Sequence, residues 1–109
     1  MKGLLTLKDL STEKILEIIK YAEELKQGLS VSYENKKMAT LFFENSTRTH
    51  YSFITAMTNL GIKVIDFNAA ISSVTKGETL YDTVRTFESL GMDGVVIRHS
   101  EDEYFNQLK

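Results

Sequence analysis

The pattern of apolar and polar positions along the chain predicts an α/β fold. Three short apolar runs, at residues 38–43, 63–67 and 94–97, are typical of strands, and the first is continuous enough to be buried on both faces, as in a parallel sheet. Segments with helical periodicity lie between these runs. The order strand, helix, strand, helix, strand predicts an open, largely parallel sheet with helices on both faces.

The predicted helices have recognisable ends. A helix before the first strand begins after Ser11 as its N-cap, residues 78–79 open the helix before the last strand, and the tail from residue 100 starts like a further helix. Three of these helices are expected to stop at a glycine: Gly28, Gly61 and Gly91. The apolar positions expected to face the core are Ile15, Ile18, Ile19 and Ala22, then Phe53, Ala56, Met57 and Leu60, then Leu80, Val84, Phe87 and Leu90.

Composition and charge narrow the class of protein. With 109 residues, of which 42% are hydrophobic and 26% charged, the chain has the size and composition of one folded domain. The net charge of -2 gives no reason to expect nucleic-acid binding, which needs a basic face. Cysteine is absent, and no apolar stretch approaches the length of a membrane span. Metal-ligand spacings and nucleotide fingerprints are also absent from the sequence. We therefore expect a cytoplasmic protein that needs neither a cofactor nor a metal.

Hydroxyls and cations occupy the loops after all three predicted strands. These loops are residues 46–49, 72–76 and 98–99, and they contain two arginines and a lysine. In an open α/β sheet, ligands bind outside the carboxyl ends of the strands, so the three loops are expected at one edge. Residues 46–49 also open a helix, whose unpaired N–H groups attract anions. A small, doubly charged phosphate is the ligand that this combination favours.

Simpler interpretations exist for each of these residues. Ser46 or Thr47 can serve as a helix N-cap, which is the more common use of such residues when they are considered alone. Arg48 can be a surface ion-pair partner, residues 76–78 a solvated loop, and His99 a hydrogen-bonded structural residue. The phosphate site is favoured because three loops meet at the same edge of the sheet.

Three motifs resemble those of the amino-terminal half of bacterial aspartate carbamoyltransferases. They are FFENSTRT at residues 42–49, SSVTKGETLYDT at residues 72–83 and VIRHSED at residues 96–102, in this order and at matching spacings. The resemblance extends over almost the whole chain. It implies that residues 1–109 form a carbamoyl-phosphate-binding domain, truncated at its carboxyl end, from an enzyme that transfers the carbamoyl group.

The resemblance also implies how the substrate is held. Ser46, Thr47, Arg48 and Thr49 would bind the phosphate through backbone N–H groups, hydroxyls and the guanidinium. Thr49 would also contact the carbamoyl oxygen. Arg98 would supply a second cationic contact to carbamoyl phosphate.

A second set of residues is expected to act between subunits. In the family, the loop that matches residues 72–76 reaches into the active site of the neighbouring subunit of a trimer, so Ser72 and Lys76 would bind substrate in trans. Glu78 would be an interface residue that pairs with Arg48 across the boundary. The residues expected to assist catalysis are Arg48, Thr49, Lys76 and Arg98.

The implied reaction is the attack of the L-aspartate amine on the carbamoyl carbon, which gives N-carbamoyl-L-aspartate and phosphate for pyrimidine synthesis. It requires no covalent intermediate, because positioning and stabilisation of developing negative charge suffice. The lysine loop at residues 72–79 favours the aspartate branch over ornithine carbamoyltransferases, which share the Ser-Thr-Arg-Thr motif. An ornithine enzyme and a phosphate-binding module without catalysis are the alternatives.

Two features depart from the family pattern. His50 stands where many members have arginine or lysine, so we expect a weakened or pH-dependent cation near the phosphate. The sequence also lacks the His-Pro-x-Gln motif and the aspartate-binding domain. We therefore expect the chain to be a fragment, inactive alone.

Overall fold

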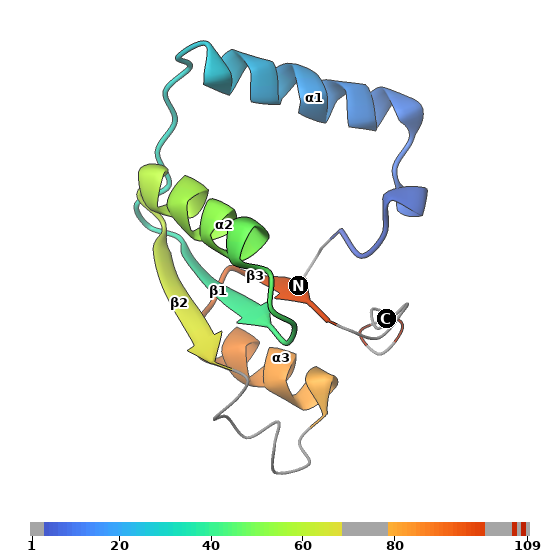
Figure 1. Cartoon of the computed structure of the whole chain (residues 1–109), viewed down its shortest axis with the longest axis vertical. Helices are drawn as coiled ribbons and strands as arrows, with labels where there is room; N and C mark the ends of the chain where they lie inside the picture. The colour runs from blue at the N-terminus through green and yellow to red at the C-terminus, as the bar shows by residue number, and fades with distance from the viewer. Residues whose placement is uncertain (1–3, 69–78, 100–105, 107, 109) are drawn as a thin grey trace. The chain divides into compact units, whose positions relative to one another are not determined.

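The computed structural model describes residues 4–68, 79–99, 106 and 108, which fall into two compact units. Residues 2–32 form one unit, with a short 3-10 helix, η1 (Leu7–Asp9), and the helix α1 (Thr12–Lys26). The second unit begins at Tyr33 and contains the sheet (Figure 1). Ser72, Lys76 and Glu78 lie outside the described residues, as does most of the predicted tail helix.

Helix α1 has the ends that the sequence predicts. The Ser11 hydroxyl caps it by accepting a hydrogen bond from the N–H of Lys14 at 3.1 Å, and Gly28 follows its last turn with a φ of 112°. No residue of α1 is buried, so the predicted apolar stripe has no core to face within this unit. The unit of residues 2–32 contains no sheet or second α-helix among its described residues that could cover the stripe.

The sheet has three parallel strands: β1 (Lys37–Phe42), β2 (Lys63–Asn68) and β3 (Gly94–Arg98). Their order is β2-β1-β3, so β1 lies in the centre, and its residues Ala39, Thr40 and Leu41 are fully buried. Thr40 pairs with Asp66 on one side, and Phe42 pairs with Arg98 on the other. The predicted parallel sheet is confirmed.

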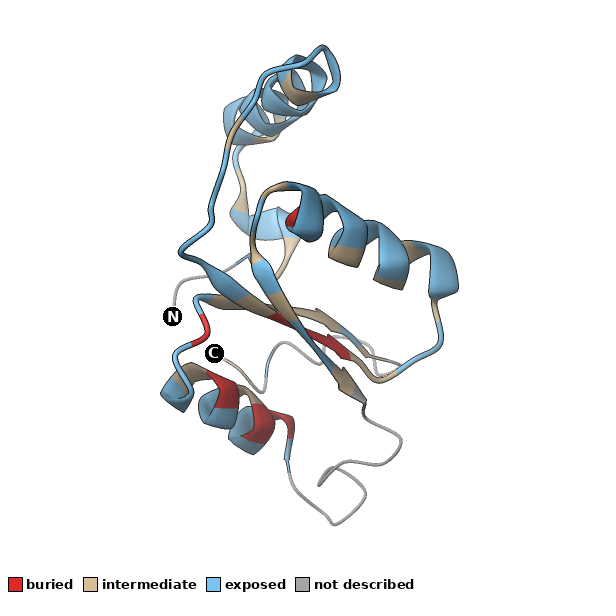
Figure 2. Cartoon of the chain, turned by 90° about the vertical axis from the view of Figure 1, so that its left-hand side faces the viewer, coloured by how far each residue is buried: buried red, intermediate tan, exposed pale blue. Residues whose placement is uncertain are grey.

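Helices α2 (Thr47–Asn59) and α3 (Leu80–Ser89) cover opposite faces of the sheet, as Figure 2 shows. Both crossovers join parallel strands, and such connections are right-handed. The first leads from β1 to β2 and the second from β2 back past β1 to β3, so the two helices fall on different faces. This confirms the prediction of helices on both faces.

The apolar core lies between the sheet and α3. Its buried residues are Ala39, Leu41, Phe87 and Met92, and the half-buried residues packed against them are Phe43, Phe67, Val84, Val95 and Ile97. The rings of Phe67 and Phe87 meet edge to face at 5.4 Å. Leu90, predicted to face this core, is instead 62% exposed, because it is the C-cap of α3 and the chain has already turned away from the sheet. Met92, beyond that turn, is buried in its place.

The inward face of α2 differs from the predicted one. Met57 is buried as expected, but Phe53 is 44% exposed and Ala56 is also exposed. His50, Ile54 and Met57 are at least half-buried and recur at helical spacing, and the predicted Leu60, the C-cap, is half-buried as well. Compared with the predicted face, the inward face is rotated toward His50. The reason is a set of contacts between His50 and the sheet, described below.

Candidate functional site

The described candidate residues follow the carboxyl ends of two neighbouring strands, with residues 46–49 after β1 and Arg98 at the end of β3. The central strand β1 has β2 on one side and β3 on the other, and the two crossovers lie on opposite faces of the sheet. Such a point is a topological switch, where ligands bind in open α/β folds. The N–H of Phe43 donates to the carbonyl of Arg98 at 2.8 Å, so the two strands remain paired beyond the end of β1. Arg98 therefore lies beside the loop that leads from β1 into α2.

Helix α2 begins without a side-chain cap. Ser46 occupies the N-cap position, but its hydroxyl makes no capping hydrogen bond. The first N–H bonded within the helix is that of His50, which donates to the carbonyl of Ser46 at 2.8 Å. The N–H groups of residues 47–49 therefore have no acceptor within the helix. The interpretation of the Ser46 hydroxyl as a simple cap is wrong for this structure, and its oxygen remains available to a ligand.

The same turn carries uncompensated positive charge. The first turn of α2 contains no acidic residue, so no carboxylate there offsets the positive end of the helix dipole. Arg48 is exposed, and no ion pair joins it to a carboxylate in the described part of the chain. Thr47 is exposed and Thr49 is half-buried. N–H groups, hydroxyls and a guanidinium on one turn form an arrangement suited to an anion.

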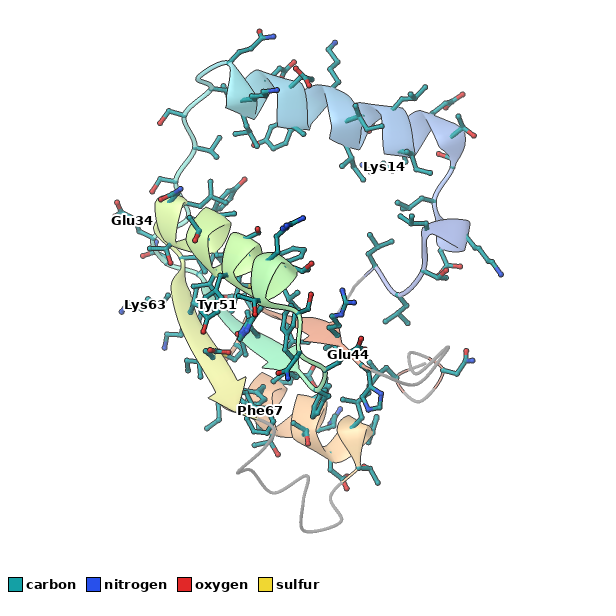
Figure 3. The ribbon with its side chains drawn as sticks, in the orientation of Figure 1. Lys14, Glu34, Glu44, Tyr51, Lys63 and Phe67 are labelled. Atoms are coloured by element: carbon teal, nitrogen blue, oxygen red, sulfur yellow. The ribbon has the colours of Figure 1, made fainter. Side chains whose placement is uncertain are left out.

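Arg98 is paired with a carboxylate from the neighbouring loop. Its Nη2 atom lies 3.6 Å from Oε1 of Glu44, and the two side chains are 43% and 40% exposed. Glu44 belongs to the loop between β1 and α2 (Figure 3). An anion bound by Arg98 would have to compete with Glu44, which sequence reasoning did not single out.

His50, which directly follows the first turn of α2, has its side chain against the sheet. Its ring stacks on Phe42 with centroids 4.4 Å apart, and its Nε2 lies 2.8 Å from Oδ1 of Asp66. The Thr40 hydroxyl donates to the same oxygen at 2.8 Å. Sequence reasoning missed Thr40 and Asp66, although both are polar interruptions of apolar strands. They occupy paired positions in β1 and β2.

His99 agrees with its simpler interpretation as a structural residue. The ring of His99 packs against Phe43 with centroids 5.2 Å apart, which fits a structural residue. The described residues contain no group of three or more His, Asp or Glu side chains arranged to hold a metal ion. None of the described helices has both the length and the apolar character of a membrane span.

Comparison with known proteins supports one family. Residues 2–109 match the family model of the aspartate/ornithine carbamoyltransferase carbamoyl-P binding domain. Aspartate transcarbamoylase from Trypanosoma cruzi, solved in complex with carbamoyl phosphate, is 34% identical with a TM-score of 0.82, over 97% of this chain and 34% of that one. The catalytic subunit of the M. Jannaschii enzyme is 41% identical with a TM-score of 0.78, over 98% of this chain and 37% of that one.

This chain therefore spans about a third of the length of these solved relatives, with matched shares of 34% and 37%. The family model covers nearly all of the chain, and the two structural matches agree with the strand order and with the helices on both faces. The chain belongs to the aspartate/ornithine carbamoyltransferase family, within which it corresponds to the carbamoyl-phosphate-binding domain.

Proposed function

We propose that this chain supplies the carbamoyl-phosphate site of an aspartate carbamoyltransferase. The complete protein would transfer the carbamoyl group of carbamoyl phosphate to the amine of L-aspartate, releasing N-carbamoyl-L-aspartate and phosphate. The observation that carries the proposal is the uncapped first turn of α2 with an exposed Arg48, following a strand whose end pairs with Arg98 of β3.

Each group at this edge has a chemical task in the proposal. The N–H groups of residues 47–49 and the Arg48 guanidinium hold the phosphate, whose charge rises as it leaves. Thr49 donates to the carbamoyl oxygen, where negative charge develops during attack by the amine. Arg98 exchanges Glu44 for the substrate and adds a second positive charge. The catalytic work is positioning and electrostatic stabilisation.

Ser72, Lys76 and Glu78 complete the site in the proposal. The loop reaches a neighbouring subunit of a homotrimer, where Ser72 and Lys76 contact the substrate and Glu78 pairs with Arg48. Mixing Lys76→Ala and Arg48→Ala forms of a chain extended to the length of its relatives should restore activity, because hybrid trimers contain some intact sites. Failure of the mixture to regain activity would argue against shared sites.

The aspartate branch is supported by the solved relatives. A structure of the Trypanosoma cruzi enzyme holds carbamoyl phosphate and aspartate together, at 34% identity to this chain. The lysine loop points to the same branch. An extended chain that carbamoylated ornithine and not aspartate would overturn this part of the proposal. Four further points stay predictions: the cytoplasmic location, the place in pyrimidine synthesis, the inactivity of the chain alone, and the absence of nucleic-acid and membrane partners.

The test of the phosphate site is a titration of the chain with inorganic phosphate and with carbamoyl phosphate, in which NMR of the backbone amides reports binding. We expect the amides of residues 47–49 to shift. Arg48→Ala should weaken binding by about tenfold or more, because a charge-assisted contact is lost. Arg85→Ala is the matched control: Arg85 is an exposed arginine on α3, 3.4 Å from Glu88, and its loss changes the net charge equally. Equal effects of the two substitutions would refute the site.

A further inference from the structure

We propose that His50 and Asp66 are positioning residues, which hold the first turn of α2 in the geometry that binds the anion. The inference rests on the proposed function and adds two residues that would not touch the substrate. Their hydrogen bond would act as a tertiary substitute for the missing N-cap of α2.

The local signals that normally stabilise a helix start are absent from α2. In α1 the Ser11 hydroxyl accepts from the N–H of Lys14, and in α3 the Thr79 hydroxyl accepts from the N–H of Asp82, each at 3.1 Å. Both of these helices also carry an acidic residue in the first turn. Among the described helices, α2 alone has neither device. A turn that must leave its N–H groups open to a ligand cannot use them for its own capping.

Contacts with two strands take the place of the cap. The His50 ring lies on Phe42 at the end of β1, with an angle of 21° between the ring planes. Its Nε2 atom meets Asp66 of β2 at 2.8 Å. The imidazole side chain is 19% exposed, so most of it is shielded from water. Residue 50 directly follows the anion-binding turn, so anchoring it also restricts residues 46–49.

The carboxylate of Asp66 is itself oriented by the sheet. Thr40 is fully buried, and its hydroxyl donates to the same Oδ1 atom at 2.8 Å. Because Thr40 and Asp66 are paired in register, the strands determine where this oxygen lies. The chain of contacts therefore runs from a buried strand, through Asp66 and His50, to the open N–H groups of α2.

The consequence is preorganisation. A turn held in its binding geometry loses little conformational freedom when the anion arrives, whereas a loosened turn must be ordered at that moment, which weakens binding. The effect appears in the affinity of the folded protein for phosphate, and not only in the stability of the fold. This separates a positioning role from a merely structural one.

The experiment measures the dissociation constant of inorganic phosphate by NMR, using only the folded population of each variant. His50→Phe keeps an aromatic ring over Phe42 but removes the donor to Asp66, and we expect about fivefold weaker binding. His50→Gln restores a donor and should return the affinity to within about twofold of the unsubstituted chain. Hydrogen exchange of the amides of residues 47–50 should accelerate in His50→Phe and recover in His50→Gln. Thr55→Ala, at an exposed position in the middle of α2, should change neither quantity.

A second substitution tests whether the two residues act through each other. Asp66→Ala should weaken phosphate binding as much as His50→Phe, and the double variant should be no worse than either single variant. An unchanged affinity in folded His50→Phe would overturn the inference, as would equal losses in His50→Phe and His50→Gln. If the unsubstituted chain bound no phosphate at all, the proposed function would fail, and the inference with it.

Discussion

Glu44 is predicted to lower the affinity of this site for anions. It lies 3.6 Å from Arg98, and the two side chains are 40% and 43% exposed. A bound phosphate must displace Glu44 from Arg98 and then remain near its negative charge. We therefore expect Glu44→Gln to tighten the binding of phosphate.

The magnitude follows from the exposure of the pair. At this separation two unit charges interact by about 1 kcal/mol in bulk water, and by several times more in a buried setting. Because both side chains are well exposed, the pair itself is worth about 0.5 to 1 kcal/mol, as is usual for surface ion pairs. Removal of the competing charge should therefore tighten phosphate binding by about two- to fivefold.

The assay is a phosphate titration at low and at high ionic strength, in which the NMR shifts of the amides of residues 47–49 report binding. The gain in Glu44→Gln should shrink in about 1 M salt, where the Debye length falls to about 3 Å. Glu17→Gln is the matched control, because Glu17 forms a comparable surface pair with Lys14 at 3.4 Å on α1 and its loss changes the net charge equally. The reasoning is refuted if Glu44→Gln binds phosphate no more tightly than the unsubstituted chain, or if Glu17→Gln gives the same gain.

Two further predictions concern stability. Leu41 is fully buried in the central strand, so Leu41→Ala leaves a cavity in the core. We expect urea denaturation to show a loss of about 3 kcal/mol in the free energy of unfolding. A loss below about 1 kcal/mol would contradict the assignment of this core. Ser46→Ala should leave stability nearly unchanged because its hydroxyl makes no capping bond, whereas Thr79→Ala should cost about 1 kcal/mol. Equal losses in these two variants would show that Ser46 does cap α2.

Much of the fold could be predicted because its signals are local. Ser11 caps a helix through a bond to a residue three positions away, and Gly61 adopts a positive φ of 80° directly after α2. The apolar runs of the strands report burial without any knowledge of their neighbours. The same signals place residues 46–49 at a helix N-terminus and Arg98 at a strand end.

The inward faces of the helices were harder to predict. Phe53 lies on the apolar stripe of α2 by periodicity, yet it is exposed, because His50 anchors the helix on Phe42 and Asp66 and so determines its rotation. Leu90 continues the stripe of α3 but comes after its last full turn. Periodicity shows that a face exists, but only the contacts with the sheet decide which face it is.

The element order and the polar, positively charged start of α2 could be read from the sequence, since each depends on residues within a few positions of one another, and the strand–helix alternation was enough to predict a parallel sheet. The tertiary structure decided that the Ser46 hydroxyl is not used as a cap, that Glu44 pairs with Arg98, and that His50 meets Asp66. Such contacts join different elements and depend on strand order and register, which bring together groups that no local pattern relates. The turn proposed to bind the anion is thus visible in the sequence, whereas the residues proposed to hold it in place appear only when the strands are paired.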